Sequence, residues 1–380
     1  MSQKKYPKIC LIFGTRPEII KFSPIIRYLQ KNRRDYVTLH TSQHYSHSMD
    51  KIFFNDLNLP QPTYHLKYKN NSRGKTQIEH ITLMMNGIES ILKKSKPDIC
   101  LVQGDTNTVL AGAFVTNRLA LTRGKDGLNI KLGHVEAGLR SFDREMPEEV
   151  NRIIADNLSD YLYVPSVHSK ALLLKENVNK NKIFLTGNTV VDAVKQNLKI
   201  AQLKSNVISD LNLRPKYYAV LTLHRPENVD QKEVLKRIFS GLDRLGKRDH
   251  LDIIFPIHPR TKKQILAFKL NIPKCVRMIE PIGYLDFLVL ELNARILLTD
   301  SGGVQEEASI MHVPCMTLRN NTERPETVAA GVNTLCGSSP TKLLAGVKKM
   351  LNTKFKWKAL YGDGRSGERI VKLIDKECLA

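Results

Sequence analysis

The sequence predicts an α/β protein built from two doubly wound domains, each with a parallel sheet. Short β-prone apolar runs alternate with helix-like segments from end to end, and this alternation is typical of a parallel sheet with helices on both faces. The alternation stops at a polar stretch, Gln202 to Pro215, and then starts again. A length of 380 residues also exceeds one ordinary core and indicates two domains.

The first series of elements begins with the apolar run Lys8–Phe13. The segment that follows, Arg16–Gln30, has apolar residues at helical spacing. Asp98–Gln103 is a second buried strand, and an Ala-rich helix follows it at about Thr106–Leu119. Three more strand-like runs complete the series: Lys131–Val135, Tyr161–Val164 and Lys182–Leu185.

The second series follows the helix-like segment Asn188–Ala201 and the polar stretch. Its strand-like runs are Tyr217–Leu223, Asp252–Ile257, Arg295–Leu298 and Cys315–Leu318. We place the boundary near Gly187, which gives domains at residues 1–186 and 187–363. The amphipathic segment Glu368–Cys378 predicts a C-terminal helix, within residues 364–380, that packs back on the first domain.

The composition favours a cytoplasmic protein. Hydrophobic residues make up 42% of the chain and charged residues 25%, as in soluble globular proteins. The first ten residues lack the apolar core of a signal peptide, and no apolar run is long enough to cross a bilayer. The six cysteines are scattered without close pairs, which argues against a metal site or a disulfide framework.

The net charge of +22 raises the question of a nucleic-acid partner. The lysines are spread along the whole chain, and the sequence shows no helix-turn-helix, RNP-like or zinc-finger pattern. A single tryptophan offers little surface for base stacking. We therefore expect a small polyanionic substrate, no nucleic acid and no membrane.

Polar residues directly follow six of the predicted strands. In open α/β sheets, ligands bind beyond the carboxyl ends of the strands. We therefore expect these segments to converge in one cleft between the domains. They are Gly14–Glu18, Gly104–Asn107, His134–Glu136, His224–Asn228, His258–Thr261 and Asp300–Gly303.

The segment His134–Arg152 carries five carboxylates and four arginines or histidines. A helix that starts with Pro147 would suit Glu148 and the glutamate after it, because acidic residues favour a helix N-terminus. That explanation does not cover Glu136 and Arg140, which lie between small and apolar neighbours straight after a strand. Charged groups in such a place are costly unless they are paired or used.

The segment Asp300–Glu307 predicts a phosphate site. Gly302 and Gly303 let the backbone approach a ligand, the N–H groups of the helix start favour a phosphate, and the Ser301 hydroxyl can add a donor. Glu307, one turn on, can accept hydrogen bonds from ribose hydroxyls. The alternative is an ordinary loop with serine as N-cap. The segment has neither the three spaced glycines of a dinucleotide site nor the Gly-Lys-Ser/Thr of a P-loop, which argues against redox cofactors and ATP.

Two further groups of residues are less specific. Arg16 and Lys21 lie near a predicted helix N-terminus, which is consistent with a second phosphate contact and equally with a surface turn. His44 and His47 have no third ligand at metal spacing, so we interpret them as part of a solvated loop.

Eight motifs together carry a resemblance to a known family, the non-hydrolysing UDP-N-acetylglucosamine 2-epimerases. The resemblance spans Gly14 to about Gly337, and it implies two Rossmann-like domains facing a cleft, as in glycosyltransferases of the B type, and a homodimer. The motifs, in order, are GTRPEIIK, VQGDT, HVEAGLRS, MPEEVNR, TGNTVVD, HRPEN, DSGGVQEE and NTERPETV.

The resemblance also implies a reaction, the reversible inversion of carbon 2 of UDP-N-acetylglucosamine to give UDP-N-acetylmannosamine. The carbon 2 proton is barely acidic, so UDP leaves first, a 2-acetamidoglucal forms, and UDP adds back. This chemistry needs acid–base groups and donors to the diphosphate, and no metal or cofactor. The residues that correspond to the family's catalytic groups are Asp105, Glu136, Glu148 and His224. The corresponding UDP contacts are Arg16, Phe287 (at uracil), Ser301, Gly302, Gly303 and Glu307, with Lys21, Arg140 and Arg324 as further contacts.

Four other functions stay open on the sequence. They are an epimerase of a modified UDP-2-acetamido sugar, a UDP-sugar-dependent glycosyltransferase, a hydrolysing epimerase and a nucleic-acid binder. The chain reads QHYSHSMD from Gln43 and HPRT from His258, where family members regulated by their own substrate differ. We therefore do not expect an allosteric UDP-sugar site.

Overall fold

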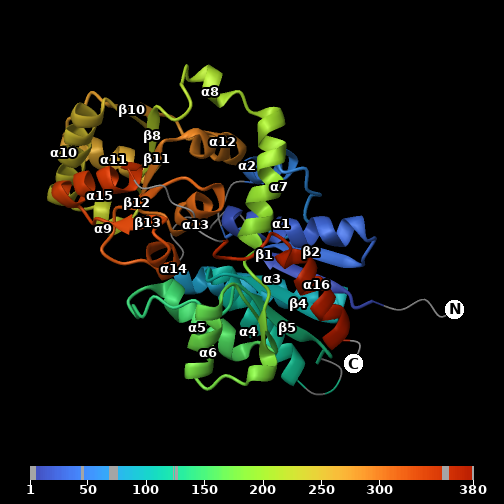
Figure 1. Cartoon of the computed structure of the whole chain (residues 1–380). Helices are drawn as coiled ribbons and strands as arrows, with labels where there is room; N and C mark the ends of the chain where they lie inside the picture. The colour runs from blue at the N-terminus through green and yellow to red at the C-terminus, as the bar shows by residue number, and fades with distance from the viewer. Residues whose placement is uncertain are drawn as a thin grey trace. The chain divides into compact units, whose positions relative to one another are not determined.

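The computed structural model describes residues 6–43, 47–67, 76–122, 124, 127–352 and 359–378, with the backbone alone at 47–51. The chain divides into two compact units, residues 1–195 with 361–380 (unit 1) and residues 196–360 (unit 2). Each unit contains one parallel sheet, with helices on both faces (Figure 1). The predicted fold class is therefore confirmed. The division runs through helix α7 (Thr189–Lys204), whereas the predicted boundary near Gly187 lies just before that helix.

Unit 1 has a seven-stranded sheet in the order β3-β2-β1-β4-β5-β6-β7. The order reverses at β1, which pairs with β2 on one side and with β4 on the other. Ligands bind at such reversals because the loops on either side of them diverge. The strands are β1 (Ile9–Phe13), β2 (Tyr36–His40), β3 (Tyr64–His65), β4 (Ile99–Gln103), β5 (Lys131–Val135), β6 (Tyr161–Val164) and β7 (Ile183–Leu185).

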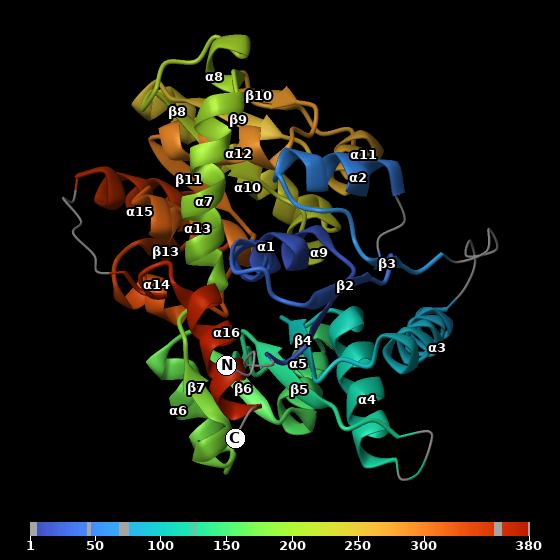
Figure 2. The same ribbon diagram turned by 90° about the vertical axis from the view of Figure 1, so that its right-hand side faces the viewer.

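Helices of unit 1 pack against this sheet and against one another. Helices α3 and α4 lie side by side, as Figure 2 shows, and their apolar residues form a core with β1 and β4. The helices are α1 (Arg16–Lys31), α2 (His47–Asp56), α3 (Gln77–Ser95), α4 (Asn107–Leu121), α5 (Pro147–Leu158), α6 (Val167–Lys175), the 3₁₀ turn Lys180–Lys182, and α16 (Ser366–Glu377).

The C-terminal helix α16 belongs to unit 1 and packs on α1. A side chain at Gly367 would lie 3.1 Å from the backbone of Ile25, so glycine permits this close approach. The Asp192 carboxylate accepts hydrogen bonds from the backbone N–H groups of Ser366 (3.1 Å) and Gly367 (3.0 Å) at the start of the helix. An acidic group suits the N–H groups that a helix start leaves without partners.

Unit 2 has a six-stranded sheet in the order β10-β9-β8-β11-β12-β13, and its order reverses between β8 and β11. The strands are β8 (Tyr218–Thr222), β9 (Asp252–Pro256), β10 (Val276–Ile279), β11 (Ile296–Thr299), β12 (Cys315–Thr317) and β13 (Asn333–Leu335). The helices are α8 (Val207–Asp210), α9 (Pro226–Val229), α10 (Lys232–Asp249), α11 (Pro259–Phe268), α12 (Tyr284–Asn293), α13 (Gly302–Met311), α14 (Pro325–Ala329) and α15 (Pro340–Asn352).

Neither a bilayer-spanning helix nor a metal-binding cluster occurs among the described residues. None of the helices in that part of the chain is both long enough and apolar enough to span a bilayer. Within the same residues, no group of three or more His, Cys, Asp or Glu side chains is arranged to hold a metal ion.

Candidate functional site

Glu136 is a buried carboxylate at the end of β5. Its side chain accepts hydrogen bonds from the Lys21 ammonium, which lies 2.7 Å from both oxygens, and from the side-chain amide of Gln103. The Asn188 amide lies 3.4 Å from Oε1. The residue has φ +68°, a conformation that costs of the order of 1–3 kcal/mol for a residue other than glycine and that clusters at functional sites. The cation and the amide donors let a charge stay in a place where an unpaired carboxylate would be very unfavourable.

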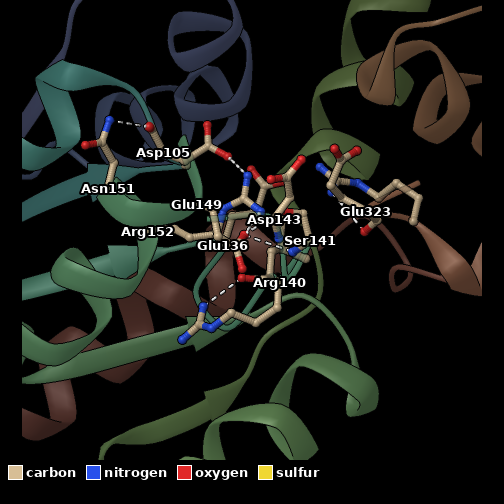
Figure 3. Close-up of polar contacts among 12 residues, drawn as sticks. Asp105, Glu136, Arg140, Ser141, Asp143, Glu149, Asn151, Arg152 and Glu323 are labelled. Atoms are coloured by element: carbon tan, nitrogen blue, oxygen red, sulfur yellow. Dashed lines mark hydrogen bonds and ion pairs between the residues drawn. The ribbon is translucent and has the colours of Figure 1, made fainter. Parts of the chain in front are cut away.

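Asp105 lies in the loop after β4 and is more open to solvent than Glu136. Its carboxylate pairs with Arg152 Nη2 at 2.5 Å, and its backbone carbonyl accepts a hydrogen bond from the Asn151 amide at 3.0 Å. Figure 3 shows the Arg152 guanidinium between Asp105 and Glu149, which lies 2.7 Å from Nη1. Arg152 therefore ties the loop of Asp105 to the first turns of α5.

The two adjacent acids at the start of α5 have different environments. Glu149 is buried, and it accepts hydrogen bonds from the backbone N–H (2.9 Å) and hydroxyl (2.9 Å) of Ser141 and from the backbone N–H of Phe142 (3.0 Å). Glu148 is exposed to solvent. Glu149 therefore holds the preceding loop, and Glu148 is the acid of this turn that is accessible to a ligand.

His134, within β5, is fully buried and links three parts of unit 1. Its Nδ1 lies 2.7 Å from the Asp156 carboxylate and its Nε2 lies 2.8 Å from the Gly104 carbonyl. Burial alone would lower the pKa of His134, but the charge and hydrogen bond of Asp156 outweigh it and raise that pKa. His134 therefore fixes the glycine that precedes Asp105 to β5 and α5.

Arg140 has two carboxylate partners in unit 1. Its guanidinium donates to Asp156 at 2.7 Å and to Glu176 at 2.6 Å, and its side chain is almost fully buried. These ion pairs explain why a cation is tolerated straight after a strand. The sequence pattern alone gave no such explanation. A contact between Arg140 and substrate stays a prediction.

Glu18 links the loop after β1 to the loop after β4, a role that the sequence reasoning missed. Its Oε2 accepts hydrogen bonds at 2.8 Å from the backbone N–H of Gly14 and from the backbone N–H and hydroxyl of Thr15, and its Oε1 accepts one from Thr106 at 2.7 Å. Burial raises the pKa of Glu18 to about 7, although the hydrogen bonds oppose this shift. The spacing Thr-x-x-Glu, a capping box, was the signal in the sequence.

The cations predicted near the start of α1 have different surroundings. Arg16 is exposed, with its guanidinium 5.6 Å from the centre of the Phe53 ring. Lys21, one turn on, pairs with Glu136 as described above. His44 and the side chain of His47 lie outside the described residues.

Unit 2 contains a cavity of about 210 Å³ at the carboxyl end of its sheet. It is lined by residues that follow β8, β9 and β10 and by the first turns of α12 and α13. Apolar walls with a few polar groups are typical of small-molecule sites. The lining includes Thr222, His224, His258, Phe287, Ser301 and Val304.

Asp300 holds His224 at the edge of this cavity. The buried carboxylate lies 3.0 Å from His224 Nδ1 and accepts hydrogen bonds from the backbone N–H groups of His224 (3.0 Å) and Arg225 (3.0 Å) and from the Asn228 amide (3.1 Å). Burial alone would raise the pKa of Asp300, but the hydrogen bond and charge of His224 outweigh it and lower that pKa. The ring of His224 is oriented through Nδ1, which leaves Nε2 as the nitrogen for a ligand.

Gly302 and Gly303, at the start of α13, are not required by the protein's own packing. A Cβ atom at Gly302 would come no closer than 3.8 Å to Glu323, and one at Gly303 no closer than 3.8 Å to Ser301. Neither glycine has a positive φ. Ser301 is the N-cap residue, but its side chain makes no capping hydrogen bond, which counts against the simple N-cap explanation. Close approach of a ligand to helix N–H groups explains both features.

The remaining predicted contacts of unit 2 lie on α12, on α13 and before α14. Phe287 of α12 lines the cavity, and Glu307 of α13 is largely buried. Arg324 donates to the Glu306 carboxylate at 2.5 Å and to the Glu323 carbonyl at 3.2 Å. Arg324 therefore has protein partners, and its contact with substrate stays a prediction.

Acid stability provides a test of the ion pair that precedes α14. Burial alone would raise the pKa of Glu323, but the hydrogen bonds (2.9 and 3.0 Å) and charge of Arg319 outweigh it and lower that pKa to about 2. A lowered pKa stabilises the fold above the ordinary value of about 4.5 and loses this effect as the pH falls towards 2. We expect Glu323→Gln to reduce the loss of unfolding free energy between pH 5 and pH 3, measured by urea titration. The same slope in both proteins would contradict this assignment.

Comparison with known proteins identifies the family. A sequence profile described as UDP-N-acetylglucosamine 2-epimerase matches residues 27–375. The chain belongs to the UDP-N-acetylglucosamine 2-epimerase family. The resemblance inferred from the eight motifs is thereby confirmed. Members of this family are isomerases, so the chain is assigned to an enzyme family.

Relatives within the UDP-N-acetylglucosamine 2-epimerase family match almost the whole chain. A protein of that name from Methanocaldococcus jannaschii is 52% identical over 373 residues, 97% of this chain and 98% of the relative. A crystal structure of the Methanocaldococcus jannaschii enzyme in complex with UDP-GlcNAc and UDP is 53% identical, covers 97% of this chain and 99% of that one, and has a TM-score of 0.85. A Neisseria meningitidis epimerase bound to UDP-GlcNAc, 32% identical, covers 97% and 100% with a TM-score of 0.85.

Proposed function

We propose that this protein interconverts UDP-N-acetylglucosamine and UDP-N-acetylmannosamine without a metal or a redox cofactor. The observation that carries the proposal is the 53% identity, over 97% of the chain, to an epimerase whose crystal structure contains UDP-GlcNAc and UDP. Two features of the molecule support it independently. Unit 1 has a buried carboxylate paired with a lysine, and unit 2 has a cavity next to a helix start with two unconstrained glycines.

In the proposed reaction, unit 2 binds the nucleotide part of the substrate. The N–H groups at the start of α13 and the Ser301 hydroxyl donate to the diphosphate, Phe287 contacts uracil and Glu307 accepts from the ribose. His224, oriented by Asp300, donates to the diphosphate as UDP leaves with the electron pair of the bond between carbon 1 and oxygen. Arg16 adds a cation for the same phosphates.

The carboxylates of unit 1 move the proton at carbon 2. Loss of UDP makes this proton acidic, and a carboxylate removes it as the C–H electrons form the double bond of 2-acetamidoglucal. A second acid protonates the opposite face, and UDP adds back at carbon 1. We propose Glu136, Asp105 and Glu148 for these steps. The ammonium of Lys21 favours the ionised form of Glu136, which a base requires.

Deuterium exchange tests the proposal directly. The protein is incubated with UDP-N-acetylglucosamine in deuterated water and followed by NMR. We expect deuterium at carbon 2 in a mixture of the two UDP-sugars. Release of free N-acetylmannosamine in place of a UDP-sugar would show a hydrolysing enzyme, and the absence of any exchange would reject the proposed substrate.

A modified UDP-2-acetamido sugar is the second candidate substrate. A relative from Pseudomonas aeruginosa named UDP-2,3-diacetamido-2,3-dideoxy-D-glucuronate 2-epimerase is 34% identical over 374 residues, 97% of this chain. The higher identity to proteins named for UDP-N-acetylglucosamine favours the first candidate. Parallel exchange experiments with both sugars decide between them through the ratio of kcat/KM values. For a glycosyltransferase, a Rickettsia africae structure at 15% identity and a TM-score of 0.56 supports a shared fold alone.

We further propose that the enzyme is a cytoplasmic homodimer. The family resemblance supports the dimer, and six free cysteines are consistent with a reducing compartment. Sedimentation velocity at two concentrations tests the dimer, and a monomer at both would contradict it. Fractionation of the source cells tests the location.

A further inference from the structure

Glu291 is a buried acid for which the proposed reaction has no use. It lies on α12, its relative exposure is 0%, and no described residue donates a hydrogen bond to either of its carboxyl oxygens within normal geometry. No described lysine, arginine or histidine forms an ion pair with it. An ionised carboxylate in such a place is very unfavourable, so the group is expected to carry a proton.

The group that acts most strongly on Glu291 is Glu307, on the adjacent helix α13. Helices α12 and α13 pack against each other, and both side chains are at least nine-tenths buried. Burial first, and then the charge and hydrogen bonding of Glu307, hold the pKa of Glu291 well above its ordinary value. Two close carboxyls cannot both ionise cheaply, and one shared proton turns their repulsion into a hydrogen bond.

Two other ionisable groups, Tyr284 and Cys315, interact with this pair. Tyr284 of α12 interacts with Glu307 and with Asn197 of α7, and burial and the two glutamates raise the pKa of its hydroxyl well above the ordinary value. Cys315 of β12 is buried nearby, and its thiol pKa is likewise raised, first by burial. Both of these neighbours therefore stay uncharged at neutral pH, and neither offers a positive charge to Glu291.

We propose that protonated Glu291 is a positioning residue, which donates a hydrogen bond to the Glu307 carboxylate and so orients it to accept hydrogen bonds from the ribose hydroxyls of the UDP-sugar. The inference rests on the proposed function, because it takes UDP as the ligand. Packing alone does not explain a glutamate here, since an apolar side chain of similar volume would avoid the cost of burial. A fixed acceptor explains it, because a carboxylate held by a donor on its inner side keeps its outer lone pairs in one direction.

The test measures UDP and 2′-deoxy-UDP binding by calorimetry for wild type, Glu291→Gln and Glu291→Leu. Wild type is expected to prefer UDP by about tenfold, the scale of one charged hydrogen bond. Glu291→Gln keeps an N–H donor and should keep the preference. Glu291→Leu should lose the preference, through weaker binding of UDP and unchanged binding of 2′-deoxy-UDP. Glu280→Gln, at an exposed acid of the same unit, is the matched control.

The outcomes separate the inference from the function on which it rests. If wild type binds no UDP, the proposed function fails. If wild type binds UDP and Glu291→Leu keeps the ribose preference, the role of Glu291 is rejected and the proposed function stands. Should Glu291→Leu not fold, the pH profile decides: wild type should lose UDP affinity at high pH as the shared proton leaves, and Glu291→Gln should not. Parallel profiles for these two proteins would also reject the role.

Discussion

Replacing Glu136 with glutamine is expected to lower the rate of deuterium incorporation at carbon 2 about a thousandfold, within the range found for general acid–base groups. The amide has the shape of the carboxylate and still accepts a hydrogen bond from Lys21, but it cannot take up a proton from carbon. UDP affinity should change little, because the proposed nucleotide contacts of unit 2 are not altered. NMR exchange rates and calorimetric titration with UDP measure the two effects.

The control for this substitution is Glu145→Gln, in the same acid-rich segment. Glu145 is exposed to solvent, so its replacement removes the same charge from a place without buried partners. Exchange in Glu145→Gln should match wild type. Turnover in Glu136→Gln within tenfold of wild type would reject Glu136 as the base.

Replacing Gly302 with alanine is expected to weaken UDP binding about a hundredfold without loss of stability. The new Cβ has room in the protein, since its nearest described neighbour is 3.8 Å away, and alanine is the better residue in a helix. A diphosphate drawn against the helix N–H groups would meet the added methyl group, and a loss of this size corresponds to about 2.7 kcal/mol. Calorimetry measures the affinity and thermal unfolding measures Tm.

Gly241→Ala is the opposite control within the same unit. Its Cβ would lie 3.1 Å from Leu343 and 3.3 Å from Pro340, so the packing of α10 on α15 must give way. We expect a lower Tm with unchanged UDP affinity in the folded protein. Wild-type affinity in Gly302→Ala would show that no phosphate lies against this helix start.

Most strands were predictable from sequence, including the edge strand β7, whereas β2, β3, β10 and β13 were missed. Strands β4 and β11 are fully buried and apolar up to their last residue, as expected for strands covered on both faces. Strand β2 was missed because it contains Thr38 and His40, which are buried by virtue of hydrogen bonds that the sequence does not display. The outer strand β10 was missed because it is only four residues long and its two middle residues, Arg277 and Met278, are exposed.

For the candidate site, the acid-rich segment His134–Arg152 indicated a position in the fold, but the sequence could not distinguish the environments of its individual acidic residues. The pairing of Glu136 with Lys21 joins residues 115 positions apart, and no local pattern encodes it. The difference between buried Glu149 and exposed Glu148 depends on hydrogen bonds that form only when the preceding loop folds over the helix start. Sequence gives the chemical types, and tertiary contacts decide which group is held in the protein and which faces a ligand.

The hydrogen bonds of Glu18 have a consequence for enzyme engineering. A single carboxylate joins Gly14, Thr15 and Thr106, and so it connects the loop before Arg16 to the loop of Asp105. His134 and Arg152 extend the same connection to α5. A substitution made in one of these loops to accept a different sugar will therefore move the other loops. The loops have to be redesigned together.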